Sequence, residues 1–247
     1  ELYESGENII QYFKDQDSRV LNSIQDILIS YDFQSGSYIK GVEKNKEYIN
    51  AYTKLLADVI NDLGVFENII EVGVGEATTL GNLIPKIKKN QFLEAYGFDI
   101  SWSRIHLGNQ YLNKIGVDAN LFVSDLFNIP LSDSSIDIVY TSHSIEPNGG
   151  REKEAIEELY RVAKKYLVLL EPTYEFASTE GQKRMQANGY VQNLEKTIKE
   201  LGYDLIDYKP FEVVINSLNP TGLYIIKKRS EDKKELVKFC CPIAKDN

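Results

Sequence analysis

The chain has 247 residues, of which 43% are hydrophobic and 26% are charged, and its formal net charge is −9. This length suits one α/β domain with an elaborated terminus better than two independent domains. No apolar run reaches the roughly 18 residues of a membrane-spanning helix, and the polar, acidic start of the sequence does not resemble a signal peptide. We therefore expect a cytoplasmic protein that does not enter the membrane.

The basic side chains form only short runs, for example at 86–89, 164–165 and 227–229, and these runs are scattered among acids. A protein that binds duplex nucleic acid needs a basic face that displaces phosphate counterions. We therefore expect no nucleic-acid partner. Only six of the basic residues are arginines, so each of these potential anion-binding side chains is worth locating.

Two adjacent cysteines, Cys240 and Cys241, are the only ones in the chain, and this favours a reduced setting. The tail that contains them resembles the start of a zinc-ribbon segment with the pattern C-P-x-C. The position of the second cysteine is Ala244, so the metal clamp is incomplete, and we predict no metal site.

In chain order, residues 1–64 show helical periodicity and are expected to form an N-terminal helical cap. Turn residues and aromatics at 31–38 interrupt this pattern. A longer helix is predicted over 48–60, with Tyr48, Tyr52 and Leu56 on one face, and its C-cap is expected near Gly64.

From residue 68 the pattern changes to short apolar strands that alternate with helices, which is typical of a doubly wound α/β fold with a mostly parallel sheet. Strands are predicted at 68–72, 95–98, 119–123, 136–140, 166–170, 203–208 and 223–226. Helices are predicted at 78–88, 102–115 and 151–163, with a polar, partly helical segment at 178–201.

The clearest motif follows the first strand, where Glu71 precedes Gly73 and Gly75. The glycines allow a tight turn and a close approach of the backbone to a ligand. A dinucleotide site prefers a third glycine, at the position where this chain has Thr78. Glu71 and Glu76 also place negative charge where a pyrophosphate would lie, and this favours a ligand with a cationic amino group and a sulfonium.

Further acids follow the second and third strands, at Asp99 and at Asp125. Asp99 is suited to accept hydrogen bonds from ribose hydroxyls, and the run Ser124–Leu126 to bind an adenine amino group and cover its face. Each acid alone is equally consistent with a helix N-cap. Three acids at the ends of successive strands nevertheless indicate one crevice, where open α/β sheets bind ligands.

The segments EVGVGEA, YGFDIS, SDLFNIPLSDSSIDIVY and YLVLLEP resemble, in this order, the motifs of class I S-adenosylmethionine (SAM)-dependent methyltransferases, particularly the small-molecule "type 11" group. The resemblance spans about 65–175 and extends to about 228. It implies a Rossmann-like sheet of seven strands, the last of them antiparallel, and SAM as the cofactor. It also implies that Glu71, Gly73 and Gly75 flank the methionine moiety, Asp99 the ribose, and Ile100, Asp125 and Leu126 the adenine.

With this resemblance, we divide the chain into a helical cap (1–64), a SAM-binding core (65–229) with a substrate lid inserted at 178–201, and a tail (230–247). Ser124 and Ser142 complete the predicted cofactor site. The group often carries a hydrophobic-His-His run after the fourth strand, whereas this chain has SHSIEPN from Ser142.

His143 follows the fourth strand and is the first candidate for a general base, because histidine titrates near neutral pH. Glu146 is the competing base, and the alternative role of His143 is to bond the following loop. His106 lies within an amphipathic helical pattern and is expected to be structural.

Five residues are predicted to contact the acceptor. Glu171 and Tyr174 follow the fifth strand, Arg184 and Tyr190 come from the predicted lid, and Tyr38, with Tyr31 and Gln34, is expected to close over the cofactor from the N-terminal side. Arg184 is suited to clamp a phosphate or carboxylate, and the alternative is an exposed helix arginine.

These features favour O-methylation of a small polar molecule. The pattern of the chain also resembles methyltransferases encoded among bacterial surface-polysaccharide genes, and this suggests a sugar or a phosphorylated precursor. N-methylation, a nicotinamide-dependent oxidoreductase and a non-catalytic SAM-binding module remain alternatives. The sequence does not indicate an oligomeric state.

Overall fold

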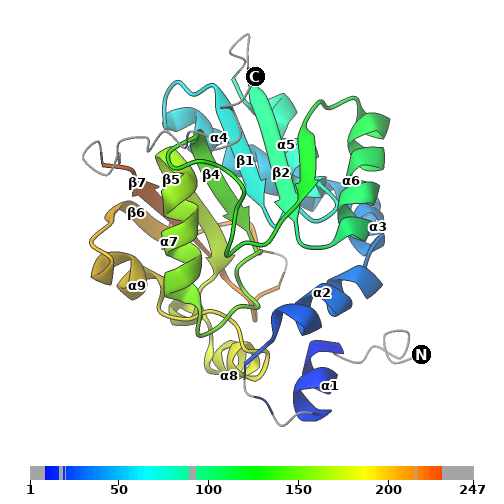
Figure 1. The fold of residues 1–247 in the computed structure, drawn as a ribbon, viewed down its shortest axis with the longest axis vertical. Coiled ribbons are helices and arrows are strands. Elements are labelled where there is room, and N and C mark those ends of the chain that lie inside the picture. Colours follow the sequence, from blue (N-terminus) through cyan, green and yellow to red (C-terminus); the bar gives the residue numbers. More distant parts are fainter. Residues whose placement is uncertain (1–8, 17–18, 20, 89–92, 215, 230–247) are drawn as a thin grey trace, which may run out of the picture.

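The structure is a computed structural model that describes residues 9–16, 19, 21–88, 93–214 and 216–229. Seven strands form one sheet in the order β3-β2-β1-β4-β5-β7-β6 (Figure 1). β7 is antiparallel to both of its neighbours, and the other pairs are parallel. This confirms the expected doubly wound, seven-stranded methyltransferase-like sheet. The strands are β1 (Asn68–Val72), β2 (Glu94–Asp99), β3 (Asn120–Val123), β4 (Ile136–Ser142), β5 (Ala163–Pro172), β6 (Asp204–Pro210) and β7 (Thr221–Lys227).

Helices cover both faces of the sheet. One apolar core joins a sheet face to α4 (Lys46–Asp62), α5 (Thr78–Leu83) and α6 (Trp102–Ile115). The opposite core joins the other face to α7 (Glu152–Val162) and α9 (Leu194–Glu200). In Figure 1, α7 lies in front of the sheet, and α4 and α5 lie behind it. Because both faces are covered, β4 and β5 are almost entirely buried, as parallel central strands usually are.

The N-terminal helices α1 (Ile9–Gln16), α2 (Ile24–Phe33) and α3 (Ser37–Lys44) precede α4. Figure 1 shows α1 and α2 below the carboxyl ends of the parallel strands, next to α8 (Thr179–Ala187). The buried ammonium group of Lys14 donates to the carbonyl of Ala187 at 3.0 Å, so a side chain of α1 caps the C-terminal end of α8. The two segments, far apart in sequence, therefore meet over the edge where ligands bind in such sheets.

Two predicted element boundaries were wrong. The break predicted at 31–38 is much shorter, because α2, held by a capping box between Ser23 and Asp26, continues to Phe33. Gly36, with φ of +90°, provides the turn. The helix predicted at 78–88 ends at Leu83 and continues as the 3-10 turn η1 (Ile84–Lys86), because Pro85 has no N–H to donate. The other predicted strands and helices are present with small shifts at their ends.

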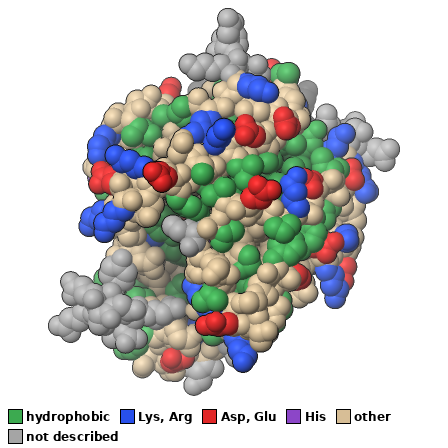
Figure 2. Space-filling view, turned by 180° about the vertical axis from the view of Figure 1, so that it is seen from behind, with side chains coloured by type: hydrophobic (Ala, Val, Ile, Leu, Met, Phe, Trp, Pro, Cys, Tyr) green, Lys and Arg blue, Asp and Glu red, His purple; other side chains and the backbone are tan. Residues whose placement is uncertain are grey.

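Figure 2 shows the side of the molecule opposite to the view of Figure 1. Lysines and arginines alternate with acids around an apolar centre, and no continuous basic area is visible on this face. In the described part of the chain, none of the helices has the length and apolar character needed to cross a bilayer.

Candidate functional site

A cavity of about 890 Å3, including space open to solvent, lies at the carboxyl ends of β1, β2, β3 and β4. All nine residues predicted to bind the cofactor line it: Glu71, Gly73, Gly75, Asp99, Ile100, Ser124, Asp125, Leu126 and Ser142. The strand order reverses between β1 and β4, so the cavity lies at the topological switch point.

The glycine turn is shaped by two close approaches. Gly73 has φ of +65°, and a Cβ added to it would lie only 2.3 Å from Cβ of Ser144. Gly75 has φ of +54°, and its N–H donates to Oδ2 of Asp99 at 3.0 Å. Gly73 therefore requires glycine for backbone and packing reasons, and Gly75 favours glycine because of its positive φ. The turn brings the ends of β1, β2 and β4 into one wall of the cavity.

Glu71 is a buried acid on that wall. Its carboxylate accepts a hydrogen bond of 2.7 Å from the hydroxyl of Tyr140, yet burial raises its pKa to about 8. A group that loses this much hydration gains from a cationic partner. Glu71 thus provides a local preference for a cationic ligand group, as the sequence suggested.

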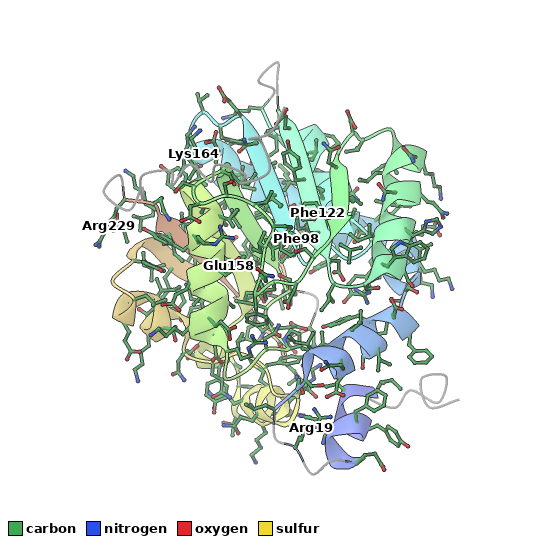
Figure 3. The ribbon with its side chains drawn as sticks, in the orientation of Figure 1. Arg19, Phe98, Phe122, Glu158, Lys164 and Arg229 are labelled. Atoms are coloured by element: carbon green, nitrogen blue, oxygen red, sulfur yellow. The ribbon has the colours of Figure 1, made fainter. Side chains whose placement is uncertain are left out.

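Asp99 ends β2 and is also buried. Burial raises its pKa, although the N–H groups of Gly75 and Ser101 donate to its two oxygens. Beside it, the rings of Phe98 and Phe122 lie 5.4 Å apart between centroids (Figure 3), and Phe98 also lines the cavity. Asp125 accepts from the N–H of Phe127 at 2.9 Å. This part of the cavity therefore combines carboxylates with flat apolar surfaces, which suits a nucleoside.

The structure gives Glu76 a different role from the one that its charge suggested. Its two carboxylate oxygens accept from the N–H groups of Gly36 and Ile39, each at 2.8 Å. Glu76 therefore binds the first turn of α3, where a negative charge is favoured. It does not line the cavity, and its charge holds the N-terminal helices rather than selecting the ligand.

The loop after β4 places His143 at the cavity in an uncommon backbone conformation, with φ of +56°. The N–H of His143 donates to the carbonyl of Leu170 at 2.8 Å. Its Nδ1 lies 3.2 Å from Oε2 of Glu146, and its Nε2 lies 2.8 Å from Oγ1 of Thr221. Both ring nitrogens are therefore engaged, and the imidazole has a fixed orientation.

Burial alone lowers the pKa of His143, but the hydrogen bond and negative charge of Glu146 outweigh this effect and raise the pKa above its usual value. The Glu146 side chain is 13% exposed. Within the described residues, Oε2 of Glu146 contacts His143 and Asn219, whereas Oε1 has no hydrogen-bond donor. Oε1 is therefore the one atom of the pair that remains available to a ligand.

A second cavity of about 1,050 Å3, including space open to solvent, adjoins the first and shares Tyr38, Ser142 and His143 with it. Its walls come from α3, α4 and the loop after β4, and they include Tyr48, Tyr52 and Glu146. The hydroxyl of Tyr52 lies 2.8 Å from Oγ of Ser142. The His143–Glu146 pair therefore stands at the boundary between two chambers.

The residues predicted to contact the acceptor are not all at this boundary. Tyr38 lines both cavities. Glu171 is fully buried below the loop, and its Oε1 accepts from the N–H groups of Ser144 and Ile145. Burial raises the pKa of Glu171 to about 7. The hydroxyl of Tyr174, in the 3-10 turn η2 (Tyr174–Phe176), accepts from Gln186.

Arg184 and Tyr190 lie closer to the loop after β4. The guanidinium of Arg184 lies 5.7 Å from the centre of the Tyr190 ring. The next residue, Val191, donates its N–H to the carbonyl of Glu146 at 2.9 Å. The segment after α8 therefore packs directly against the Glu146 loop. In contrast, α9 is part of the core through Leu194 and Ile198, so only α8 and the segment after it remain candidates for the predicted lid.

Three residues of the cavities had not been singled out from the sequence. Tyr48 and Tyr52 were visible only as part of a helical packing face. Arg104 is 4% exposed, lines the first cavity and lies between the rings of Tyr31 and Tyr38. An arginine two residues after a helix begins carries no sequence signal of this role. His106, on α6, is exposed, stacks on the exposed ring of Trp102 and lines neither cavity.

Cys240 and Cys241 lie outside the described residues, as does the whole 230–247 tail. Within the part of the chain that the structure describes, no three histidine, cysteine, aspartate or glutamate side chains are grouped as metal ligands.

Residues 69–166 match a family model described as a methyltransferase domain. The search of curated proteins found no match. Many solved structures share the fold. Magnesium protoporphyrin IX methyltransferase from Synechocystis PCC 6803, solved with bound S-adenosylhomocysteine, matches with a TM-score of 0.58 at 13% identity, over 81% of this chain and 99% of that chain.

A SAM-dependent methyltransferase from Methanosarcina mazei matches with a TM-score of 0.56 at 16% identity, over 69% of this chain and 96% of that one. The [4+2]-cyclase SpnF matches with a TM-score of 0.56 at 13% identity, over 71% of this chain and 80% of the cyclase. At sequence identities this low, the matches establish only that the fold is shared. The cyclase shows that one fold can serve different chemistry.

Proposed function

We propose that the chain is a class I SAM-dependent methyltransferase that methylates a hydroxyl group of a small polar metabolite. The observation that carries this proposal is the arrangement of the two cavities. The first is lined by all nine residues expected at the cofactor, and the second adjoins it at the His143–Glu146 pair. A donor and an acceptor bound side by side would meet at that pair.

In this proposal the first cavity holds SAM. Glu71 faces the cationic end of the cofactor, Asp99 the ribose, and Asp125, Leu126 and Ile100 the adenine. When bound, SAM supplies a methyl group on a sulfonium, from which the group can be displaced in line. The residues of the chain position the two reactants, and such positioning is worth about 7–11 kcal/mol of the barrier in well-oriented reactions.

The second cavity is proposed to hold the acceptor. Its lining combines phenol groups from Tyr38, Tyr48 and Tyr52 with the His143–Glu146 pair. Such a lining supplies hydrogen bonds and flat apolar surface together, which is typical of sugar-sized polar ligands. A sugar or a phosphorylated precursor of a surface polysaccharide is the acceptor class that we propose.

Proton removal is assigned to the pair rather than to the imidazole alone, because both nitrogens of His143 already have partners. As the O–CH3 bond forms and the S–CH3 bond breaks, the hydroxyl proton moves to Oε1 of Glu146. Nδ1 of His143 donates to Oε2 and holds the carboxylate in position while Oε1 takes up the proton. General-base help of this kind typically contributes about 10²–10⁴-fold.

N-methylation of a small amine is the second candidate, and the same acceptor cavity favours it because Glu146 is suited to bind an ammonium group. An amine must lose its proton before it reacts, but it needs less assistance from a base once neutral. The two reactions therefore differ in how strongly the rate depends on the His143–Glu146 pair.

The test is a methyl-transfer screen with SAM labelled at its methyl group and a panel of hydroxylated and amino compounds, including sugars and sugar phosphates. Labelled product from a hydroxyl acceptor, with a rate at least 100-fold lower in Glu146→Gln, would support the proposal. Transfer only to amines, with little effect of Glu146→Gln, would favour N-methylation. A matched control is Glu154→Gln, which removes an exposed carboxylate on α7.

A further inference from the structure

Arg104 is a buried cation that forms no ion pair with the described residues. Its side chain projects from the first turn of α6, its N–H donates to Ser101, and its Nε donates to the carbonyl of Tyr31 at 3.0 Å. No carboxylate of the described residues lies within ion-pair distance, and the buried Nη2 has no hydrogen-bond partner. The charge of Arg104 acts on the carboxyl group of Asp99, where it opposes the rise in pKa caused by burial, but the two groups form no ion pair. A ligand anion in direct contact with the guanidinium would therefore stabilise this buried cation further.

Two tyrosines fix the direction of this guanidinium. Its carbon lies 4.6 Å from the ring centre of Tyr31, at the end of α2, and 4.6 Å from that of Tyr38, on α3. Such cation–π contacts hold an arginine in place without neutralising it. The Nη1 end reaches the glycine turn, where a Cβ added to Gly75 would lie 3.3 Å from it. Arg104 is therefore preoriented beside the turn that flanks the methionine moiety in the proposed function.

The charges of the first cavity are complementary to the charges of SAM. Among the described lining residues, Glu71, Asp99 and Asp125 are acids, and Arg104 is the sole permanent cation. SAM and S-adenosylhomocysteine each have a single anionic group, the carboxylate of the amino-acid moiety. Their amino group, and in SAM the sulfonium, match the acids.

We propose that Arg104, held between Tyr31 and Tyr38, binds the carboxylate of the cofactor. This assignment rests on the proposed function and adds to it a residue that joins the cofactor to the N-terminal helices. Because Arg104 contacts α2 and α3 as well as the cavity, the bound carboxylate would also stabilise the packing of these helices over the site. A planar guanidinium suits a carboxylate, whereas lysine offers a point charge without the fork.

The experiment compares two ligands that differ only in the carboxylate: S-adenosylhomocysteine and its decarboxylated form, S-adenosyl-3-thiopropylamine. Each is titrated calorimetrically into the wild-type protein, Arg104→Met and Arg104→Lys. We expect Arg104→Met to bind S-adenosylhomocysteine about 30-fold or more weakly, as is usual when one member of a buried charge pair is removed. The affinity of Arg104→Met for the decarboxylated ligand should stay within about threefold of wild type. The affinity of Arg104→Lys for S-adenosylhomocysteine should lie between those of wild type and Arg104→Met.

A matched control is Arg229→Met, which removes an exposed arginine beyond the end of β7, at the opposite edge of the sheet (Figure 3). This variant should bind both ligands as wild type does. Equal weakening of both ligands in Arg104→Met would show a structural role and overturn the assignment. Unchanged binding of S-adenosylhomocysteine in Arg104→Met would also overturn it, while leaving the proposed function intact. Failure of the wild-type protein to bind either ligand would contradict the proposed function itself.

Discussion

Nε2 of His143 lies 2.8 Å from the hydroxyl oxygen of Thr221, a buried residue at the start of β7. This contact turns one ring nitrogen away from the acceptor cavity while the other faces Glu146. His143, the first candidate for the base from its residue type alone, is therefore held as the partner of the Glu146 carboxylate. The same geometry is used by carboxylate–imidazole pairs elsewhere, where one member orients the other and sets its protonation.

The first prediction separates the two members of this pair. Glu146→Gln keeps the size of the side chain and an oxygen that can accept from Nδ1, but it cannot take up a proton. We expect kcat to fall about 10²–10⁴-fold while the affinity for S-adenosylhomocysteine, measured by calorimetry, stays unchanged. A variant with normal turnover would exclude Glu146 as the proton acceptor.

The second prediction concerns pH. Because the pKa of His143 is raised by Glu146, the imidazole is charged at pH values where an ordinary histidine is already neutral. The pair can accept a proton only while His143 is neutral. We therefore expect kcat to be high at pH values above the pKa of His143 and to decline as the pH falls through that pKa, which lies above about 6.5. In His143→Gln we expect the residual activity to lack this decline of kcat with falling pH. If the same decline persists in His143→Gln, the titrating group is on the acceptor, as expected of an amine.

The third prediction tests the glycine turn. Gly73→Ala introduces a Cβ that would clash with Ser144 at a positive φ, whereas Gly116→Ala places one at φ of +70° with nothing within 4 Å. Gly116→Ala should therefore cost only backbone strain, about 1–3 kcal/mol of the free energy of unfolding. Gly73→Ala should cost more and should also abolish binding of S-adenosylhomocysteine. Denaturant unfolding and calorimetry measure both effects, and equal behaviour of the two variants would refute the role of the close approach.

The fourth prediction concerns Glu76 and the N-terminal helices. Glu76→Ala removes the acceptor for the N–H groups of Gly36 and Ile39. We expect faster hydrogen exchange at these two amides, with exchange in β4 unchanged, because local opening of the first turn of α3 becomes easier. Glu43→Ala, which removes an exposed acid from the same helix, serves as the control. Normal protection of both amides in Glu76→Ala would contradict the anchoring role.

The fifth prediction follows from Glu71. Its pKa is about 8 in the folded chain and near 4.5 when unfolded. Its contribution to stability is therefore complete below pH 4.5 and is lost as the pH rises through 8. A cationic ligand group requires the ionised form, so the affinity for S-adenosylhomocysteine should decrease as the pH falls from 8 to 6, with proton release on binding near pH 7. Glu71→Gln should bind more weakly and show no such release. Equal release in both proteins would rule out Glu71 as its source.

The fold was predictable because its signals are local. The strand at 68–72, the glycine turn and the helix from Trp102 to Ile115 all follow from periodicity and breakers, and the order of the motifs fits one sheet topology. The nine residues expected at the cofactor meet in one cavity because the carboxyl ends of parallel strands share an edge.

The acceptor side was less predictable because it depends on contacts between distant segments. Tyr52 reaches Ser142 across 90 positions of sequence, and Arg104 reaches Tyr31 across 73. Neither pairing has a local pattern. Glu76 was misinterpreted for the same reason, since its partners lie in the helix that precedes the sheet and not in the motif that contains it.

The central claim, that the cavity at the ends of β1 to β4 binds SAM, is tested most directly by calorimetric titration of the protein with S-adenosylhomocysteine, with NAD⁺ titrated in parallel. We predict micromolar binding of one S-adenosylhomocysteine per chain and no binding of NAD⁺. Binding of NAD⁺ alone, or of neither compound, would contradict the account.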